Sequence, residues 1–327
     1  MSDGYLFVPL PDRVNRRKHD AAVFDRHLLD ALSGTINVRF ICEQPVHIGA
    51  GFKRLHGPRI VRGAVRIRDG LGLPGSSLKG VIRSRFEAIT YSCTDSPKDK
   101  VWDVRSSTGI TKARFRRGTL DLPAFGTCSP RDPKMCPACA LFGRMSQRSR
   151  ITVTDFAAAT AEDFALFDLP EQFGPNIHHV GTAKVIEGPS RDRGSSEMFE
   201  VSSLKGRKFA LGQGRRVEDA KLQPVEVIPA GTALDGQIRF QNVLPAELGG
   251  LLVAIGKEPA SKLKIGGGKC YGLGRLRLHS ASCHLRGQSA EVTELVEQSW
   301  RAAFTAASSD RFGIGEETLV RIHQGEC

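Results

Sequence analysis

TINVRFICEQ, residues 35–44, alternates apolar and polar side chains, so that every second residue from Ile36 to Cys42 would point to the same face of an extended chain. This period is typical of a half-buried β-strand. Further along, LPGSSLKGVIRSRFEAITY, residues 73–91, spaces its apolar residues three and four apart, which predicts a helix with one apolar face. A strand followed by such a helix is the first half of a βαβ unit.

The other strongly patterned segments continue this order. ITVTDFAAA (151–159) predicts a strand, VEVIPAGTALDGQIRFQNV (225–243) a pair of strands, PAELGGLLVAIGKE (245–258) a helix, and GRLRLHSASCHL (274–285) a last strand. Strand, helix, strand, strand, helix, strand is the split βαβ pattern of ferredoxin-like and RNA-recognition folds. We therefore expect an α+β fold built on a modified ferredoxin-like palm.

Two segments interrupt this order. Residues 92–150 are rich in Lys, Arg, Ser, Pro and Cys and predict an insertion, whereas residues 174–225 are polar and glycine-rich, which favours a long protruding β-hairpin. The expected parts are an N-terminal extension (1–33) with a helix at 21–32, palm segments (34–91, 151–173 and 226–285), the insertion (92–150), the hairpin (174–225), and a C-terminal tail (286–327) with a helix at 290–304.

The charge balance favours a polyanionic partner. The chain has 47 Lys and Arg against 35 Asp and Glu, a net charge of +12, and residues 98–150 alone hold twelve Lys or Arg against four Asp. Clustered positive charge suits nucleic acid better than a neutral small molecule. The sequence has no apolar run of about 18 residues and no apolar core near its N-terminus, so we expect neither a membrane span nor a signal peptide, and a cytoplasmic location.

A glycine-rich segment, KIGGGKCYGLGRLRL (264–278), raises the question of nucleotide binding. It does not match a phosphate-binding P-loop, because Lys269 is followed by Cys270 and the segment runs from a predicted helix into a strand. The same order excludes the dinucleotide fingerprint. Instead, five glycines with Lys264, Lys269 and Arg275 at their margin predict a ribbon that lies against an extended sugar-phosphate chain.

The start of the helix predicted at 73–91 is a second candidate for phosphate binding. Ser76 can cap this helix, and Ser76, Ser77, Lys79 and Arg83 would lie near its N-terminal end, where free backbone amides also attract phosphate. The alternative interpretation is a solvated basic stripe on a core helix.

The spacing of four cysteines predicts a metal site. Cys136 and Cys139 form a C-x₂-C pair, and Cys128 lies eight residues before it. Cys93, which opens the same insertion, is the candidate for the fourth ligand, with His178 and His179 as the alternatives. Thiolates at this spacing can close on one tetrahedral zinc ion, which would tie together a segment too polar to build its own core. Free structural thiols and a redox pair are the alternatives.

Four segments, in this order along the chain, resemble the RAMP superfamily of CRISPR-associated proteins: LPGSSLKGVIRSRFE, CPACALFGRMSQRSRITVTDF, VIPAGTALDGQIRF and KIGGGKCYGLGRLRL. The resemblance spans roughly residues 34–283, and is strongest to the repeated backbone subunit of type III and type IV effector complexes. It implies a modified RNA-recognition palm, a zinc-containing or helical insertion and a β-hairpin thumb. It also implies copies stacked as a filament along a guide RNA (crRNA), other effector subunits as partners, and base pairing of the guide with target DNA or RNA.

In such subunits the helix start and the glycine-rich loop touch the guide backbone, and the thumb folds over it. Carried onto this chain, with neighbouring basic residues, the candidate RNA contacts are Lys53, Arg54, Ser76, Ser77, Lys79, Arg83, Lys184, Arg191, Arg193, Gly266, Gly267, Gly268 and Lys269.

One departure from the family pattern bears on activity. Cleaving type III subunits have an aspartate after the first strand, whereas RLHGPRIV (54–61) offers His56 there, and Asp69 lies close to the helix. A histidine can be a general base, but the cleaving pattern relies on a carboxylate. We therefore expect a non-cleaving, type IV-like subunit without catalytic residues. A metal-dependent endoribonuclease of the type III kind and an unrelated zinc-containing RNA-binding protein are the alternatives.

Overall fold

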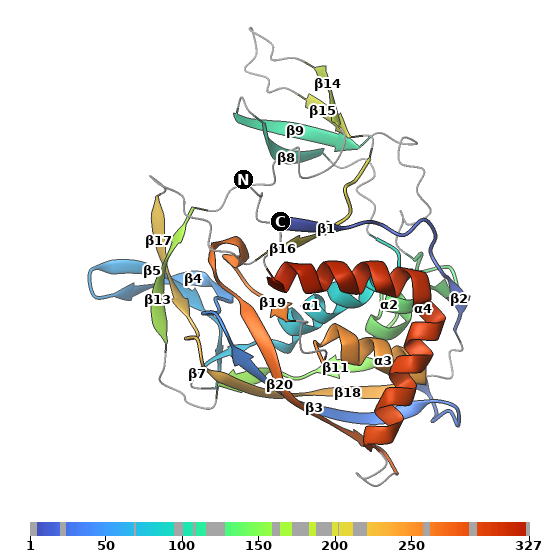
Figure 1. Ribbon diagram of the computed structural model, residues 1–327. Helices are drawn as coiled ribbons and strands as arrows, with labels where there is room; N and C mark the ends of the chain where they lie inside the picture. Colours follow the sequence, from blue (N-terminus) through green and yellow to red (C-terminus); the bar gives the residue numbers. More distant parts are fainter. Residues whose placement is uncertain are drawn as a thin grey trace.

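The computed structural model describes residues 5–19, 24–68, 70–94, 101–106, 109–115, 128–158, 164–171, 183–187, 198–201, 203–211, 221–257, 262–287 and 293–324. A curled antiparallel sheet with helices on one side forms its centre (Figure 1). Four strands make the middle of the sheet, in the order β20 (Arg275–Leu285), β3 (Leu32–Cys42), β18 (Ala233–Val243) and β12 (Phe156–Ala158).

The connections between these four strands are those expected from the sequence. Helix α1 (Gly75–Ala88) follows β3, β18 follows β12, and helix α3 (Pro245–Ala254) joins β18 to β20. Each neighbouring pair is antiparallel, with Ile36 opposite Ile238 on one side of β3 and opposite Cys283 on the other. The palm therefore has the split βαβ topology that the periodicity predicts.

Short strands extend the palm sheet at its margins. Strands β7 (Gly70–Leu73) and β6 (Arg66–Ile67) continue beyond β12, and β19 (Leu263–Lys264) pairs with β20. Strand β11 (Ile151–Val153) pairs with β18 just before β12, so the strand predicted at 151–159 is split in two.

The core lies between the sheet and its helices. Ile36, Val38, Phe40 and Cys42 are all buried, as the alternation in β3 predicts, and the polar residues between them face away from the helices. From the other side, α1 contributes Leu78, Ile82 and Phe86, and α3 buries Leu248, Leu251 and Leu252. A further helix, α4 (Thr293–Gln324), packs on α3 and α1 and buries Trp300 and Phe304.

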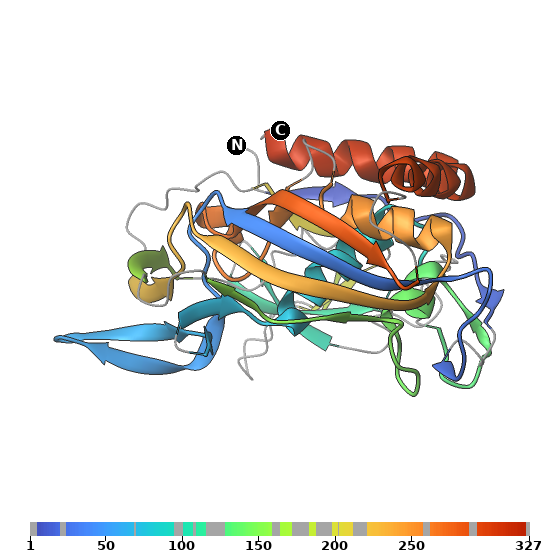
Figure 2. The ribbon, with the colours of Figure 1, turned by 90° about the horizontal axis from the view of Figure 1, so that it is seen from below.

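A second, smaller sheet extends from the palm. Its order is β13 (Ala165–Pro170), β17 (Leu222–Val227), β5 (Arg59–Ala64) and β4 (Gly49–His56). The antiparallel pair β4 and β5 forms a long hairpin that projects from the body, at the left of Figure 2.

A third sheet contains two of the strands that fall within the predicted thumb (174–225), whose other described strands lie in different sheets. Strands β14 (Ala183–Glu187) and β15 (Met198–Val201) pair antiparallel, and β15 also pairs with β9 (Gly109–Phe115), which pairs with β8 (Val101–Ser106). Two pairs lie elsewhere: β1 (Tyr5–Val8) with β16 (Arg207–Ala210), and β2 (Arg17–Lys18) with β10 (Lys134–Met135). The insertion also contains the short helix α2 (Pro137–Phe142). The N-terminal extension thus adds strands to the body.

Three local predictions were wrong. Residues 24–31 form turns and the chain enters β3 at Leu32, so there is no helix across the described part of 21–32. The two strands within 225–243, β17 and β18, pair with other strands and not with each other. Ser76 does not cap α1; Pro74 occupies that position, and the Asp155 carboxylate accepts a hydrogen bond from the Gly75 N–H at 2.8 Å.

The C-terminal helix is longer than predicted, since α4 continues to Gln324 and bends along its length (Figure 1). No helix within the described ranges combines the length and the apolar character that a bilayer crossing requires.

Candidate nucleic-acid interface and metal centre

The glycines of the segment 264–278 have backbone roles in the palm. Gly266, Gly268, Gly272 and Gly274 all have φ between 68° and 88°, the left-handed region that favours glycine. A Cβ at Gly266 would overlap the carbonyl oxygen of His47, and one at Gly274 would overlap that of Ile265. Turn geometry and close backbone packing therefore account for four of the five glycines, without a sugar-phosphate chain beside them.

Lys264 holds this glycine loop in place. Its Nζ donates to the carbonyl oxygens of Leu273 at 2.9 Å and Lys269 at 3.3 Å, and to the side-chain oxygen of Gln44. Burial, reinforced by the positive charges of Arg275 and Lys269, lowers the pKa of Lys264 to about 7. Lys264 is thus a structural residue whose charge changes near neutral pH.

A basic groove joins the helix start to the glycine loop. The groove has a volume of about 510 Å³ and brings Ser77 of α1 beside Lys264 and Lys269. Lys208 from β16, Lys262 just before β19 and the buried Arg85 of α1 complete its basic lining, which has no Asp or Glu among the described residues. We call it the lysine groove.

Sequence reasoning missed Lys208 and Lys262. Lys208 lies in a two-stranded pairing with β1 that has no periodic signal, and its ammonium sits 3.6 Å from the centre of the Tyr5 ring. Lys262 pairs with Glu43 at 2.8 Å, from a chain segment far away in sequence. Only the tertiary fold brings these lysines to the groove.

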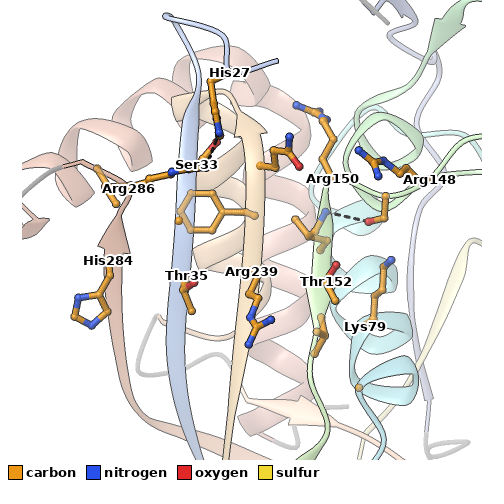
Figure 3. Close-up of a pocket in the computed structure, with 18 of the residues that line it drawn as sticks. His27, Ser33, Thr35, Lys79, Arg148, Arg150, Thr152, Arg239, His284 and Arg286 are labelled. Atoms are coloured by element: carbon orange, nitrogen blue, oxygen red, sulfur yellow. Dashed lines mark hydrogen bonds between the residues drawn. The ribbon is translucent and has the colours of Figure 1, made fainter. Parts of the chain in front are cut away.

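Ser76 and Lys79 line a different cavity, on another face of α1 (Figure 3). Residues at successive positions of a helix are rotated by about 100°, so Ser76 and Ser77 cannot point into the same space. The helix start therefore divides between the two cavities. Burial and the charge of Arg83 lower the pKa of Lys79.

Arg83 has partners within the protein. Its guanidinium donates to Glu87 at 2.9 Å, to the carbonyl oxygen of Gly143 at 3.0 Å and to the sulfur of Cys139 at 3.6 Å. These contacts connect α1 to α2. Arg83 is half-buried and satisfied, so its role in this structure is to support the cysteine centre.

The four predicted cysteines come together in one buried cluster. Cys93 follows α1, Cys128 opens the turn before β10, and Cys136 and Cys139 lie at the start of α2. Their four sulfur atoms all lie within 4.8 Å of one another. The fold therefore brings Cys93, the candidate for the fourth ligand, to the three cysteines that the spacing selects.

The geometry of this cluster fits a tetrahedral metal site. The sulfur of Cys93 lies 3.5 Å from that of Cys136, 3.7 Å from Cys139 and 3.9 Å from Cys128. A zinc ion with Zn–S bonds of about 2.3 Å sets its sulfurs about 3.8 Å apart. The N–H of Cys136 donates to the sulfur of Cys128 at 3.2 Å, and the N–H of Cys139 donates to the sulfur of Cys136 at 3.5 Å. With Arg83 these donors reach three of the four sulfurs, and they would help to hold them as metal-bound thiolates.

A comparison with models of protein families agrees with this fold and with these sites. A family model described as the RAMP superfamily matches residues 39–277. The chain belongs to the RAMP superfamily. Membership indicates a CRISPR-associated function in RNA binding. A search of curated proteins gave no match.

The remaining candidate RNA contacts of this RAMP protein are dispersed. Lys53 and Arg54 are exposed on β4 of the projecting hairpin, and the Arg54 guanidinium stacks 4.9 Å from the centre of the Phe52 ring. Lys184 lies in β14, while Arg191 and Arg193 fall outside the described residues.

His56, the position of the cleaving aspartate in the type III pattern, is the last residue of β4, next to the turn of the hairpin. Its ring packs against Phe164 at 4.9 Å, and its Nε2 lies 3.5 Å from the carboxylate of Glu226. Glu226 is fully buried and accepts hydrogen bonds from Arg66 and from the N–H of Ala64, contacts that lower its pKa against the opposing effect of burial. Asp69 falls outside the described residues.

Proposed function

We propose that this RAMP protein is the guide-RNA-binding backbone subunit of a CRISPR effector complex of the type IV kind. Copies would associate along the crRNA and present it for base pairing with target nucleic acid, beside other effector subunits. In this role the protein must hold any guide, so its contacts would go to the backbone rather than to base edges.

The lysine groove is the observation that carries this proposal. Two sequence-distant motifs, the helix start and the glycine loop, meet there with Ser77 and Lys269, and the fold adds Lys208 and Lys262. Phosphate oxygens of a single strand would accept hydrogen bonds from the ammonium groups of Lys208 and Lys269 and from the Ser77 hydroxyl, while the ammonium of Lys262 is held by Glu43. The glycines let the loop pack closely against the palm, so that Lys269 stands at the groove edge.

We infer further that the subunit does not cleave its target. The carboxylate beside His56 is that of Glu226, which is buried and engaged by Arg66, so it is poorly placed to bind a metal ion or to act as a base. Guide-matched RNA should remain intact with the assembled protein and Mg²⁺. Regularly spaced cuts that disappear in His56→Ala would contradict this inference.

We also propose that the cysteine cluster binds a structural zinc ion. Its four sulfur ligands leave no open coordination position, so the ion would tie α1 to the insertion and take no part in chemistry.

The groove can be tested by charge reversal. We expect Lys208→Glu with Lys269→Glu to strip guide RNA from protein coexpressed with a guide, as measured by the ratio of absorbance at 260 and 280 nm. Lys18→Glu with Arg321→Glu, two exposed cations outside the groove, serves as the matched control. Equal RNA content in both variants at moderate salt would reject the groove.

A further inference from the structure

A second cavity of the palm lies away from the lysine groove, on the sheet face opposite the helices. It has a volume of about 950 Å³ and crosses one end of β20, β3, β18 and β11 before reaching the start of α1. Figure 3 shows these strands side by side, with the side chains of Thr35, Thr152 and Arg239 along them and Lys79 of α1 at the far edge. We call it the sheet-end cavity.

The charged side chains that line the sheet-end cavity are basic. Lys79, Arg148, Arg239 and Arg286 line it with two histidines, and the described lining includes no Asp or Glu. None of these four cations forms an ion pair with a carboxylate in the described part of the chain, although Arg148, Arg239 and Arg286 have neutral partners. The cavity therefore has positive charge available for an anionic ligand.

Arg150 lines the same cavity, but its role is structural and it is not available to a ligand. It is buried, it pairs with Glu247, and it donates to the carbonyl oxygens of Ala140 and Asn242. Its guanidinium is fully satisfied by protein groups. Arg148 and Arg239, by contrast, are exposed, and their neutral partners leave several N–H donors for solvent or a ligand.

The arrangement suits an extended chain of phosphates. The cations come from four separate places, the turn after β20, β18, the loop before β11 and α1, so they are spread along the cavity instead of enclosing one small anion. Hydroxyl groups stand between them at Thr35 and Thr152. A sugar-phosphate backbone offers acceptors at such intervals.

The lining also argues against stacking of bases on this face. RNA-recognition domains bind single strands through exposed aromatic rings on the equivalent sheet face. Here Phe240 is buried, and the outward positions of β3 and β18 hold Thr35, Asn37, Gln237 and Arg239. The chemistry of the face is that of backbone contacts.

We propose that the sheet-end cavity is a second binding site for the phosphodiester backbone of nucleic acid, separate from the lysine groove. Ser76 and Lys79 then belong to this site, and Arg148, Arg239 and Arg286 are its principal contacts. This goes beyond the proposed function, which assigns the guide to the groove alone. The guide and target strands have the same backbone chemistry, so the experiment uses a separate probe for each of them.

The test uses Arg148→Ala, Arg239→Ala and Arg286→Ala together in the full chain, with Lys18→Ala, Arg131→Ala and Arg321→Ala as the control. The control removes the same charge from exposed cations that lie outside both cavities. The probes are a fluorescent single-stranded RNA of mixed sequence and the same RNA annealed to its complement. Loss of three phosphate contacts should reduce the slope of log K against log salt by about two for the single strand.

Each result decides the proposal. Weaker binding of the single strand identifies the guide as the ligand, and weaker binding of the duplex alone identifies the target strand. Binding of both probes equal to that of the control overturns the proposal. The Lys208→Glu, Lys269→Glu variant, measured in parallel, reports on the groove independently, so failure of one site does not imply failure of the other.

Discussion

At the scale of single residues, the glycine loop shows that a glycine-rich composition can arise either from contact with a ligand or from the backbone geometry of the loop itself. Gly274 has φ of 88°, and a Cβ there would overlap the Ile265 carbonyl oxygen. Glycine count alone therefore says little about a ligand. In the proposed function the phosphate contact of this loop is Lys269, and its placement depends on the glycine turns being intact.

Gly274→Ala should destabilise the fold by about 2 kcal/mol or more, since it combines a positive φ with a backbone overlap. Gly80→Ala is the matched control, because a Cβ at Gly80 meets nothing within 4 Å and φ there is not positive. The control should be neutral or stabilising by about 0.5 to 1 kcal/mol. Urea denaturation measures both, and equal midpoints would contradict the role given to Gly274.

Lys264 predicts a pH dependence of RNA binding. Its pKa of about 7 in the fold lies below the ordinary value of 10.5, so the free protein gains stability as pH rises between these values. RNA phosphates favour the protonated form, so affinity should fall by about fivefold, or about 1 kcal/mol, as pH rises from about 6 to about 8.5. Lys264→Gln, neutral throughout, should bind with a flatter pH profile; a profile as steep as that of the wild type would rule out Lys264.

At the scale of elements, the strongly periodic segments were predicted correctly and the short or unpatterned ones were not. The alternation in β3 and the apolar face of α1 match the buried residues. The helix predicted at 21–32 failed because Asn242, distant in sequence, bonds the backbone of Arg26 and Leu28 and holds a turn. The pattern of residues 21–32 gives no information about these hydrogen bonds to Asn242, because they depend on the tertiary fold.

The end of α4 was missed for a related reason. Gly313 and Gly315 resemble a stop signal, yet both lie within the helix. A Cβ at Gly315 would lie 2.5 Å from the carbonyl oxygen of Ala88, so the glycine permits α4 to pack against the end of α1. The cysteine cluster, in contrast, was predictable, because ligand spacing is written in the sequence.

Cys136→Ser with Cys139→Ser should abolish zinc content and destabilise the protein by several kcal/mol, about the scale of structural zinc sites. These cysteines join α2 to the chain that follows α1, and half of the ligand set would be lost. Cys270→Ser lies outside the cluster and should keep full zinc. Zinc is measured by elemental analysis and stability by thermal unfolding; full occupancy in the double variant would mean that the ligands are elsewhere.

At the scale of the whole molecule, the fold arranges positive charge in two separate places around one helix start. The lysine groove and the sheet-end cavity lie on different faces of α1, and both have linings without carboxylates in the part of the chain described. The net charge of +12 predicts a polyanionic partner, but not this division, because it depends on the packing of β16, β11 and β20 around α1. At this scale we therefore propose that the protein contacts the nucleic-acid backbone at two places on a palm that the cysteine cluster joins to the insertion.

The most direct test of the central claim is the mass of the purified protein, expressed with and without a guide RNA, by light scattering with absorbance at 260 and 280 nm. The account predicts that the guide-containing sample holds RNA together with several protein copies, and that its mass grows with guide length. An RNA-free monomer that remains a monomer when guide is added would contradict it.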